Sequence, residues 1–232
     1  MGPEREQDLH LQVGLGQAMS RTIVVGDIHG CYDELMEMLE RVGFAPDDRV
    51  VCVGDLVTKG PKNREVLELF MTDARFRTVI GNHDLALRRK WYGEKVKLKP
   101  SQKVLHKQLK SEKEKYLPFL NKLPFTIDLG SHLVVHAGLR PDVALYSQTS
   151  EDMTLLRTLG KDRESHGGTP WYEVYDGEQI VLFGHWPSPE PRRGPRAIGL
   201  DTGCVYGYNL TGYIIEEDRF ITIPARAAYD AG

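Results

Sequence analysis

Six polar side chains each follow a short apolar run that lies next to a glycine. They are Asp27, His29, Asp55, Asn82, His136 and His185. Carboxylate, amide and imidazole groups, with no thiolate among them, suit divalent ions such as Mn²⁺, Fe²⁺ and Zn²⁺. A single Asp-x-His pair, such as Asp27 and His29, is also common in solvated turns. Because the same pattern recurs along the chain, it predicts a metal centre.

The number of predicted ligands indicates two metal ions. Six side chains are too many for one ion that must keep a coordination position open. They suffice for two ions if one carboxylate bridges them, and Asp55 is the natural bridge because it lies in the central of the first three motifs. Two ions about 3.5–4 Å apart stabilise an in-line displacement at phosphorus and activate a water molecule. The pattern therefore predicts a phosphohydrolase with Asp55 in its catalytic machinery.

A histidine directly after the predicted ligand Asn82 could act on the leaving group. Asn82, His83 and Asp84 are consecutive in the sequence. An imidazole that stands beside the ions without binding them can donate a proton. We therefore expect Asn82 to bind metal and His83 to be the general acid.

Three strand–loop–helix units should position the first four ligands. Apolar runs at residues 22–25, 49–53 and 76–80 predict strands, and each ends in Gly-Asp or Gly-Asn. Apolar spacing predicts helices at residues 31–42 and 63–70, each after one of these loops. Alternating strands and helices form largely parallel sheets, whose loops share one edge. We expect all six ligands to lie at one sheet edge of an α/β fold.

The second half of the chain is predicted to be richer in strands. A helix is expected at residues 151–158, followed by a polar loop through residues 167–170. We find no internal repeat and no clear second domain. The predicted strands are residues 125–129, 132–135, 179–183, 196–200, 209–215 and 219–223.

Residues 90–115 differ in composition from the rest of the chain, with nine lysines against three glutamates. Helices are predicted at residues 101–109 and 112–120, after a helix-like stretch at residues 85–90. One interpretation is a solvated helical face. The other is a basic cap that attracts an anionic substrate to a nearby site.

The overall composition excludes several classes of protein. The 232 residues carry a net charge of −3, which does not indicate general nucleic-acid binding. Cys31, Cys52 and Cys204 are an odd number without short spacing, which argues against a disulfide framework and fits a reducing, cytoplasmic compartment. No apolar run approaches the roughly 18 residues of a membrane span. Residues 1–20 are polar and are expected to be a flexible leader.

Five motifs resemble, in type and order, the calcineurin-like metallophosphoesterases of the phosphoprotein-phosphatase superfamily. Residues 200–207 and Leu139 further resemble the symmetrical bis(5′-nucleosyl)-tetraphosphatase, or ApaH-like, branch. The motifs are Gly26-Asp27-Ile28-His29-Gly30, Gly54-Asp55 with Gly60, Gly81-Asn82-His83-Asp84, His136-Ala137-Gly138 and Gly184-His185.

The resemblance implies a fold and a domain organisation. The family fold is a four-layer α/β/β/α sandwich with the metal ions at the strand ends. Residues 21–223 would form a single catalytic domain, and residues 90–120 a helical, lysine-rich, cap-like insertion in it. Residues 1–20 would be the leader and residues 224–232 a tail.

The resemblance also implies a division of the ligands. One metal would take Asp27, His29 and Asp55. The other would take Asp55, Asn82, His136 and His185, with His83 as the acid. Mn²⁺ is the expected ion, and Fe, Zn and Co are the alternatives. We expect the substrate to be bound by Lys59, Asn82 and Arg140.

The chain departs from the family pattern after Asp55. Phosphoprotein phosphatases have an aspartate and an arginine where this chain has Thr58 and Lys59. Lysine is a point charge and not a planar fork, so it should hold a phosphate with less directional preference. Because Thr58 cannot supply a carboxylate to His83, we expect Asp84 or a backbone carbonyl to orient that imidazole.

The sequence therefore predicts a cytoplasmic dinuclear-metal phosphohydrolase. The favoured substrate is a dinucleoside polyphosphate or a related polyphosphorylated molecule. The alternatives are a serine/threonine phosphoprotein, inorganic polyphosphate and capped RNA. A metal-free scaffold is disfavoured because no ligand is missing, and an RNA-binding module is suggested only by the lysines. We expect no membrane partner and no obligate nucleic-acid partner.

Overall fold

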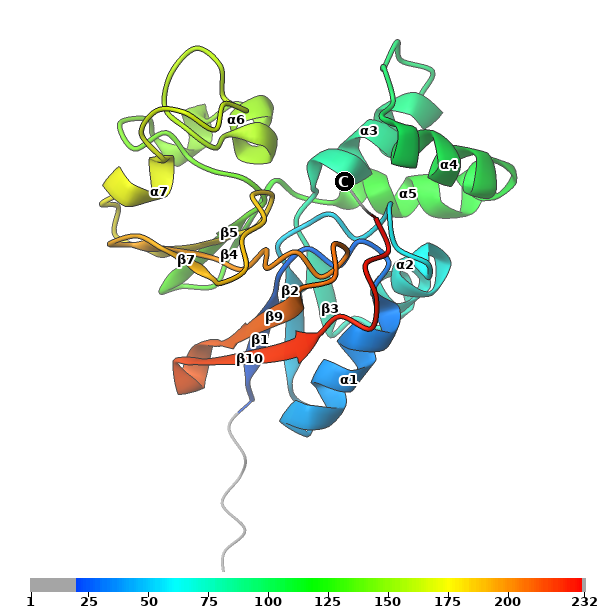
Figure 1. The fold of residues 1–232 in the computed structure, drawn as a ribbon, viewed down its shortest axis with the longest axis horizontal. Helices are drawn as coiled ribbons and strands as arrows, with labels where there is room; N and C mark the ends of the chain where they lie inside the picture. The colour runs from blue at the N-terminus through cyan, green and yellow to red at the C-terminus, as the bar shows by residue number, and fades with distance from the viewer. Residues whose placement is uncertain (1–19, 231–232) are drawn as a thin grey trace, which may run out of the picture.

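The computed structural model describes residues 20–230 and contains two five-stranded sheets (Figure 1). The first sheet has the order β10-β9-β1-β2-β3. Strands β1 to β3 are parallel, as predicted, whereas β9 and β10 extend the sheet antiparallel. Its strands are β1 (Thr22–Val25), β2 (Arg49–Cys52), β3 (Phe76–Thr78), β9 (Asn209–Ile214) and β10 (Arg219–Pro224). The predicted leader lies outside the described residues except for Ser20.

The second sheet has the order β4-β5-β6-β8-β7. Its three central strands are parallel, and β4 and β7 are antiparallel edge strands. The predicted hairpin of β4 and β5 is confirmed. Its strands are β4 (Thr126–Asp128), β5 (His132–Val135), β6 (Ile180–Phe183), β7 (Arg192–Arg193) and β8 (Ala197–Gly199).

The helices surround the two sheets. Short 3₁₀ helices are η1 (Lys110–Glu112), η2 (Leu145–Ser147) and η3 (Ile215–Glu217). The α-helices are α1 (Tyr32–Val42), α2 (Asn63–Thr72), α3 (Asn82–Trp91), α4 (Pro100–Leu109), α5 (Lys113–Lys122), α6 (Ser150–Leu155) and α7 (Trp171–Val174). Within residues 20–230, no helix has both the length and the apolar character needed to cross a bilayer.

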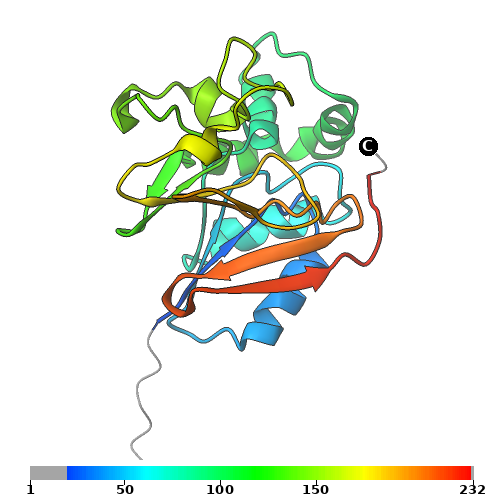
Figure 2. The ribbon, with the colours of Figure 1, turned by 60° about the vertical axis from the view of Figure 1, so that its left-hand side comes forward.

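Alternation along the strands separates the core into layers. In β1, Ile23 and Val25 belong to the cluster under α1 and α2, whereas Val24 points to the second sheet. In β2, Cys52 belongs to the cluster under α1 and α2, and Val51 belongs to the cluster that faces the second sheet. This is expected because successive side chains of a strand point to opposite faces. A third cluster lies on the far face of the second sheet, below α6 and α7. Figure 2 shows the resulting α/β/β/α order, which confirms the predicted fold class.

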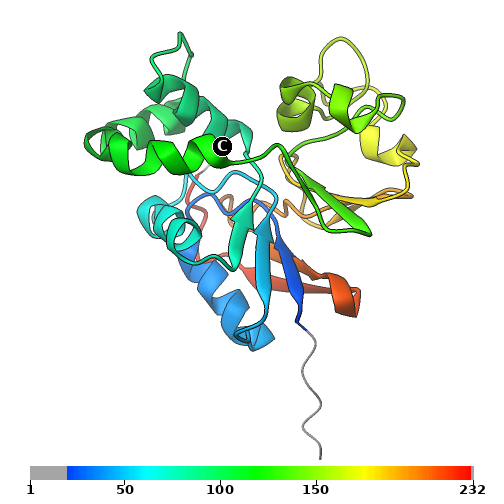
Figure 3. The same ribbon diagram turned by 180° about the vertical axis from the view of Figure 1, so that it is seen from behind.

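The lysine-rich insertion is helical and is anchored to the main core. Leu105, Leu109, Tyr116 and Leu120 are buried and join the cluster under the first sheet. Trp91 at the end of α3 donates from Nε1 to His106 Nδ1 at 3.0 Å. Viewed from behind, α3, α4 and α5 form one group beyond α2, away from the second sheet (Figure 3).

Two local predictions were wrong, and one helix was not predicted. Helix α3 begins at Asn82 and not near residue 85, because the Asp84 carboxylate accepts the Gly81 N–H and caps the first turn. Helix α6 ends at Leu155, since Thr158 pairs with Pro170 in an isolated bridge. The segment after that bridge begins α7, whose Trp171 is fully buried.

The C-terminal segment after β10 is held against the domain. The N–H groups of Tyr229 and Asp230 donate to the carbonyl of Val205 at 2.9 and 3.0 Å. The Tyr229 hydroxyl donates to Glu34 Oε1 at 2.8 Å. In Figures 1 and 2 this segment rises past the first sheet and ends beside the insertion helices.

Candidate active site

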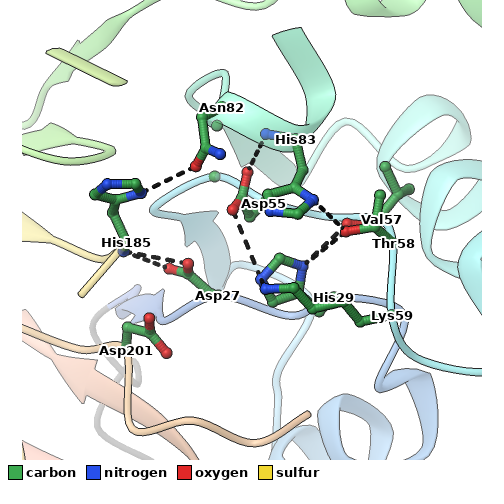
Figure 4. A network of polar contacts seen from close by, with 12 residues as sticks. Asp27, His29, Asp55, Val57, Thr58, Lys59, Asn82, His83, His185 and Asp201 are labelled. Atoms are coloured by element: carbon green, nitrogen blue, oxygen red, sulfur yellow. Dashed lines mark hydrogen bonds and ion pairs between the residues drawn. The ribbon is translucent and has the colours of Figure 1, made fainter. Parts of the chain in front are cut away.

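The six predicted ligands converge where the carboxyl ends of the two sheets meet. Figure 4 labels Asp27, His29, Asp55, Asn82 and His185 among them. Asp27 and His29 follow β1, Asp55 follows β2, and Asn82 opens α3. The two remaining histidines come from the second sheet. The prediction of one sheet edge was therefore wrong, because the site is built between two sheets. The ligands from the second sheet are His136, after β5, and His185, after β6.

Asp55 is at the centre of this group. Its Oδ2 lies 3.6 Å from His29 Nε2 and 3.5 Å from His136 Nε2. The Asn82 Oδ1 lies 2.9 Å from His136 Nε2 and 2.9 Å from His185 Nδ1. Donor atoms at these separations can bind common ions. The arrangement agrees with a bridging position for Asp55.

Backbone contacts hold two imidazoles so that one nitrogen faces the centre. The Nδ1 of His29 lies 3.0 Å from the carbonyl of Val57, and the Nδ1 of His136 lies 2.9 Å from the carbonyl of Val53. When Nδ1–H donates to a carbonyl, Nε2 keeps its lone pair for a metal. Burial lowers the pKa of both imidazoles, which favours the neutral form that binds metal.

The donor set fits divalent metal ions. The Nε2 of His185 is buried and has no hydrogen-bond partner among residues 20–230. The backbone N–H of His185 donates to the carboxylate of Asp27, with both oxygens at 3.2 Å. Burial disfavours ionisation of Asp55, but the neighbouring His136, His83 and Lys59, with the hydrogen bond from the His83 backbone N–H, outweigh it and hold its pKa below the usual value. A carboxylate that stays ionised while buried is suited to bind a cation.

Local backbone strain accompanies the site. His29, Asp55 and His185 have φ angles of 46°, 51° and 68°, in the left-handed region. Such conformations are costly for residues other than glycine and concentrate at functional sites. Gly81 is required at its position, because a Cβ atom there would lie 2.1 Å from Asp55 Oδ1.

The predicted acid His83 is buried in the same cluster, and its partner differs from the prediction. Its Nδ1 lies 2.6 Å from the hydroxyl oxygen of Thr58. Asp84 does not orient this imidazole, because its Oδ2 accepts the Gly81 N–H at 3.1 Å and the Leu56 N–H at 3.4 Å. The expectation of Asp84 or a backbone carbonyl was therefore wrong.

The predicted substrate contacts divide into two groups. Lys59 lies at the centre, with Nζ 3.1 Å from His29 Nε2 and 2.7 Å from the Tyr206 hydroxyl. Arg140 instead pairs with Asp152, with N–O distances of 2.9 and 3.0 Å. The Arg140 guanidinium is therefore paired with the carboxylate of Asp152, in the layer that contains α6.

Two residues that the sequence did not single out for the site lie around it, together with one lysine of the predicted basic cap. Arg157 lines the same cavity as Lys59, and its Nε is buried without an acceptor among the described residues. Asp201, which had been noted only as part of a motif, also lines the cavity, and burial raises its pKa to about 6. Lys99, at the N-cap of α4, brings the insertion to the cavity rim.

The cavity has a volume of about 430 Å³. Its lining combines predicted ligands with the cations of Lys59, Lys99 and Arg157. Cations at the rim of a carboxylate and imidazole cluster suit an anionic substrate that is itself drawn to bound metal. The geometry is therefore that of a site for phosphate chemistry.

Comparisons with known proteins agree with this geometry. The calcineurin-like phosphoesterase family model matches residues 20–216. The asymmetrical bis(5′-nucleosyl)-tetraphosphatase PrpE of Bacillus subtilis strain 168 is 32% identical to this chain, and the match covers 89% of this chain and 96% of that protein. The symmetrical bis(5′-nucleosyl)-tetraphosphatase of Vibrio parahaemolyticus is 30% identical to this chain, and the match covers 87% of this chain and 97% of that protein.

A crystal structure of a protein provisionally named a diadenosine tetraphosphatase has a TM-score of 0.78 to this chain. The two are 32% identical, and the match covers 90% of this chain and 95% of the other. A serine/threonine phosphatase from Saccharomyces cerevisiae has a TM-score of 0.60 at 14% identity, which shows a shared fold alone. The chain therefore belongs to the calcineurin-like metallophosphoesterase family and is a hydrolase.

Proposed function

We propose that this protein uses two divalent metal ions to hydrolyse phosphoanhydride bonds in dinucleoside polyphosphates or closely related molecules. The observation that carries the proposal is the position of Asp55 Oδ2, 3.6 Å from the His29 imidazole and 3.5 Å from the His136 imidazole. The family uses a dinuclear divalent metal centre. A carboxylate oxygen between two imidazoles from different sheets is what a bridged pair of ions needs.

The proposed ligands divide between the two positions. Asp27, His29 and Asp55 would hold one ion, with Mn²⁺ expected and Fe, Zn or Co as alternatives. When bound, the ions would supply Lewis acidity at phosphorus and activate the attacking water. The second ion would be held by Asp55, Asn82, His136 and His185.

The remaining residues would act on the substrate directly. Lys59 and Arg157 would bind the non-bridging phosphoryl oxygens, since both cations line the cavity beside the ligands. Arginine offers a planar fork and lysine a point charge, so Arg157 would fix the orientation and Lys59 mainly the charge. His83 would donate a proton to the leaving oxygen, with its imidazole held by Thr58.

The substrate class is supported by the relatives and by the cavity. Both tetraphosphatases named above act, by name, on bis(5′-nucleosyl) tetraphosphates. Cations from Lys59, Lys99 and Arg157 surround one cavity, which suits several phosphate groups better than a single monoester. The runner-up is a serine/threonine phosphoprotein, with inorganic polyphosphate and capped RNA as further alternatives.

We also propose a reducing, cytoplasmic compartment, which the three buried free cysteines support.

One combined experiment tests the proposal. Elemental analysis of the purified protein should give two metal ions per chain. The same preparation should then be assayed on diadenosine tetraphosphate, a serine phosphopeptide, capped RNA and inorganic polyphosphate. The proposal expects the highest kcat/KM on diadenosine tetraphosphate. One ion per chain, or a higher kcat/KM on the phosphopeptide, would refute it.

A further inference from the structure

A second cavity of about 300 Å³ adjoins the catalytic cavity. The two share four lining residues, so a ligand could extend from one into the other. The shared residues are Lys59, Pro100, Ser101 and Asp230. We call the second space the side cavity. Its volume is at the lower end of the range for small-molecule sites.

The far wall of the side cavity is largely apolar. Val104 of α4 is 58% exposed and lines it together with the buried Leu105. Tyr229 of the C-terminal segment also lines it. Gln108, one turn after Val104, adds an amide that can both donate and accept hydrogen bonds. An apolar wall with an amide beside it suits a flat heterocycle that has polar atoms at its edge.

The walls are held in place by contacts outside the cavity. The Tyr229 hydroxyl is bonded to Glu34, and its backbone N–H to Val205. On the other side, Asn63 Oδ1 accepts the Thr58 N–H at 2.7 Å, and Asn63 Nδ2 donates to the Gly60 carbonyl at 2.8 Å. A preformed site loses little entropy on binding. These contacts hold Tyr229 and Asn63 in place on two sides of the side cavity before any ligand binds.

Charge changes from the catalytic cavity to the side cavity. Lys59 lies at the junction, with its ammonium 3.1 Å from His29 Nε2 and thus beside the proposed metal ligands. Val104 and Leu105 of α4 line the side cavity beyond Lys59, whereas the polar Ser101 and Asp230 lie, like Lys59, on the boundary that the two cavities share. A ligand that fits both cavities would have an anionic end and an aromatic end. A nucleoside phosphate has this chemistry.

We propose that the side cavity binds the nucleoside of the substrate, with the base against Val104 and Tyr229 and its polar edge at Gln108. The phosphate attached to this nucleoside would lie past Lys59 at the catalytic centre. This inference rests on the proposed function and assigns it a specificity site. Such a site would favour a nucleotide substrate over inorganic polyphosphate, which has no base to contact Val104 and Tyr229.

Binding measured without turnover gives the first test. Titration calorimetry on the metal-loaded protein would compare adenosine 5′-monophosphate with ribose 5-phosphate, which carries the same phosphate and sugar but no base. We expect the monophosphate to bind about tenfold more tightly, the equivalent of one well-buried base contact. Val104→Asn and Gln108→Ala should reduce this preference to about threefold or less.

A matched control variant lies on the same helix. Lys107 is exposed and lines neither cavity, so Lys107→Ala should keep the full preference. In kinetics, the uncharged variants Val104→Asn and Gln108→Ala should raise KM for diadenosine tetraphosphate about five- to tenfold. The same variants should leave KM for inorganic tetraphosphate within twofold.

Two outcomes would overturn the inference. Equal binding of adenosine monophosphate and ribose 5-phosphate by the wild type would show that no base site exists. An equal rise in KM for both tetraphosphates in Val104→Asn and Gln108→Ala would show that these residues do not bind the nucleoside. Failure of the wild type to cleave diadenosine tetraphosphate would instead refute the proposed function, while calorimetry still decides whether the base binds.

Discussion

The hydroxyl oxygen of Thr58 lies 2.6 Å from Nδ1 of His83, where phosphoprotein phosphatases would have a carboxylate. Thr58 is fully buried and has a φ of 83°, so the backbone is strained to bring this hydroxyl to the imidazole. A hydroxyl holds the ring by one hydrogen bond but brings no charge. Orientation of His83 in this protein therefore depends on a neutral partner.

The first prediction removes that partner. Thr58→Val keeps the shape of the side chain and deletes the hydroxyl, so the His83 ring loses its fixed orientation. We expect kcat to fall about tenfold, with more loss on substrates with poor leaving groups, and two ions per chain to remain. Thr58→Ser should restore most of the activity. Wild-type kcat in Thr58→Val would show that the imidazole is oriented by another contact.

The second prediction separates proton donation from phosphate binding. His83→Ala should slow hydrolysis of an alkyl phosphate ester by about a hundredfold or more, because an alkoxide leaves poorly without a proton. p-Nitrophenyl phosphate should lose far less, since its phenolate leaves readily. Steady-state kinetics on both substrates checks this, with metal content as the control. An equal loss on both would assign His83 to phosphate positioning.

The third prediction concerns the bridge. Asp55→Asn keeps the size of the side chain but weakens both proposed positions, so kcat should fall by more than about a hundredfold and metal content should drop well below two. His29→Ala, which touches one proposed position, should retain more metal. Elemental analysis and steady-state kinetics on both variants test whether Asp55→Asn loses more metal and more activity than His29→Ala. Two ions and near-normal kcat in Asp55→Asn would refute the dinuclear arrangement.

The sequence was sufficient to predict most of the elements and much of the candidate site because both depend on local patterns. Strands β1 and β2 are short apolar runs whose alternate residues face two cores, and Asp27 and Asp55 follow them directly. The position of His136 beside Asp55 depends on how the two sheets pack together. No local sequence pattern indicates that packing. Arg157 was missed for a related reason, since it follows α6 in a loop with no strand and glycine before it.

The contact of Thr58 with His83 could not be predicted for a different reason. The sequence indicated only that the carboxylate was missing. The φ of 83° at Thr58 is maintained by its N–H bond to Asn63, five residues later, and by the turn that this bond closes. Side-chain partners set by an unusual backbone conformation follow from the tertiary structure and not from residue type.

The fourth prediction is about stability far from the site. Asp48 accepts the backbone N–H of Arg21 and of Ala45, each at 2.9 Å, and is 2% exposed. Burial raises its pKa, but these bonds and the Arg21 guanidinium outweigh burial and hold the pKa below the usual 3.8. The stabilisation is therefore complete above pH 3.8 and is lost as the pH falls through the folded-state pKa.

Asp48→Asn should thus lower the free energy of unfolding at pH 7 by about 1–3 kcal/mol. Its unfolding free energy should also fall less steeply on acidification than that of the wild type, because the titrating group is gone. Urea unfolding at pH 7 and at two pH values below 4 measures both effects. The exposed neighbour provides the control, since Asp47→Asn should change neither quantity. Parallel acid profiles for wild type and Asp48→Asn would contradict the assignment.

The fifth prediction decides what the lysine-rich insertion does. Of the exposed lysines at positions 95, 97, 99 and 103, the cavity lining includes Lys99. A charge at the rim concentrates a polyanion more than a monoester, and salt screens the effect over a Debye length of about 10 Å at 0.1 M. Lys99→Gln should therefore raise KM for diadenosine tetraphosphate about three- to tenfold.

A triple variant provides the matched comparison. Lys95→Gln with Lys97→Gln and Lys103→Gln removes three charges from the same insertion without touching the cavity lining. If proximity matters, this variant should change KM less than Lys99→Gln does alone, and only Lys99→Gln should flatten the rise of KM with salt. p-Nitrophenyl phosphate should respond to neither. A larger effect of the triple variant would mean that the insertion acts through its overall charge, and Lys99 would then have no special role in binding the substrate.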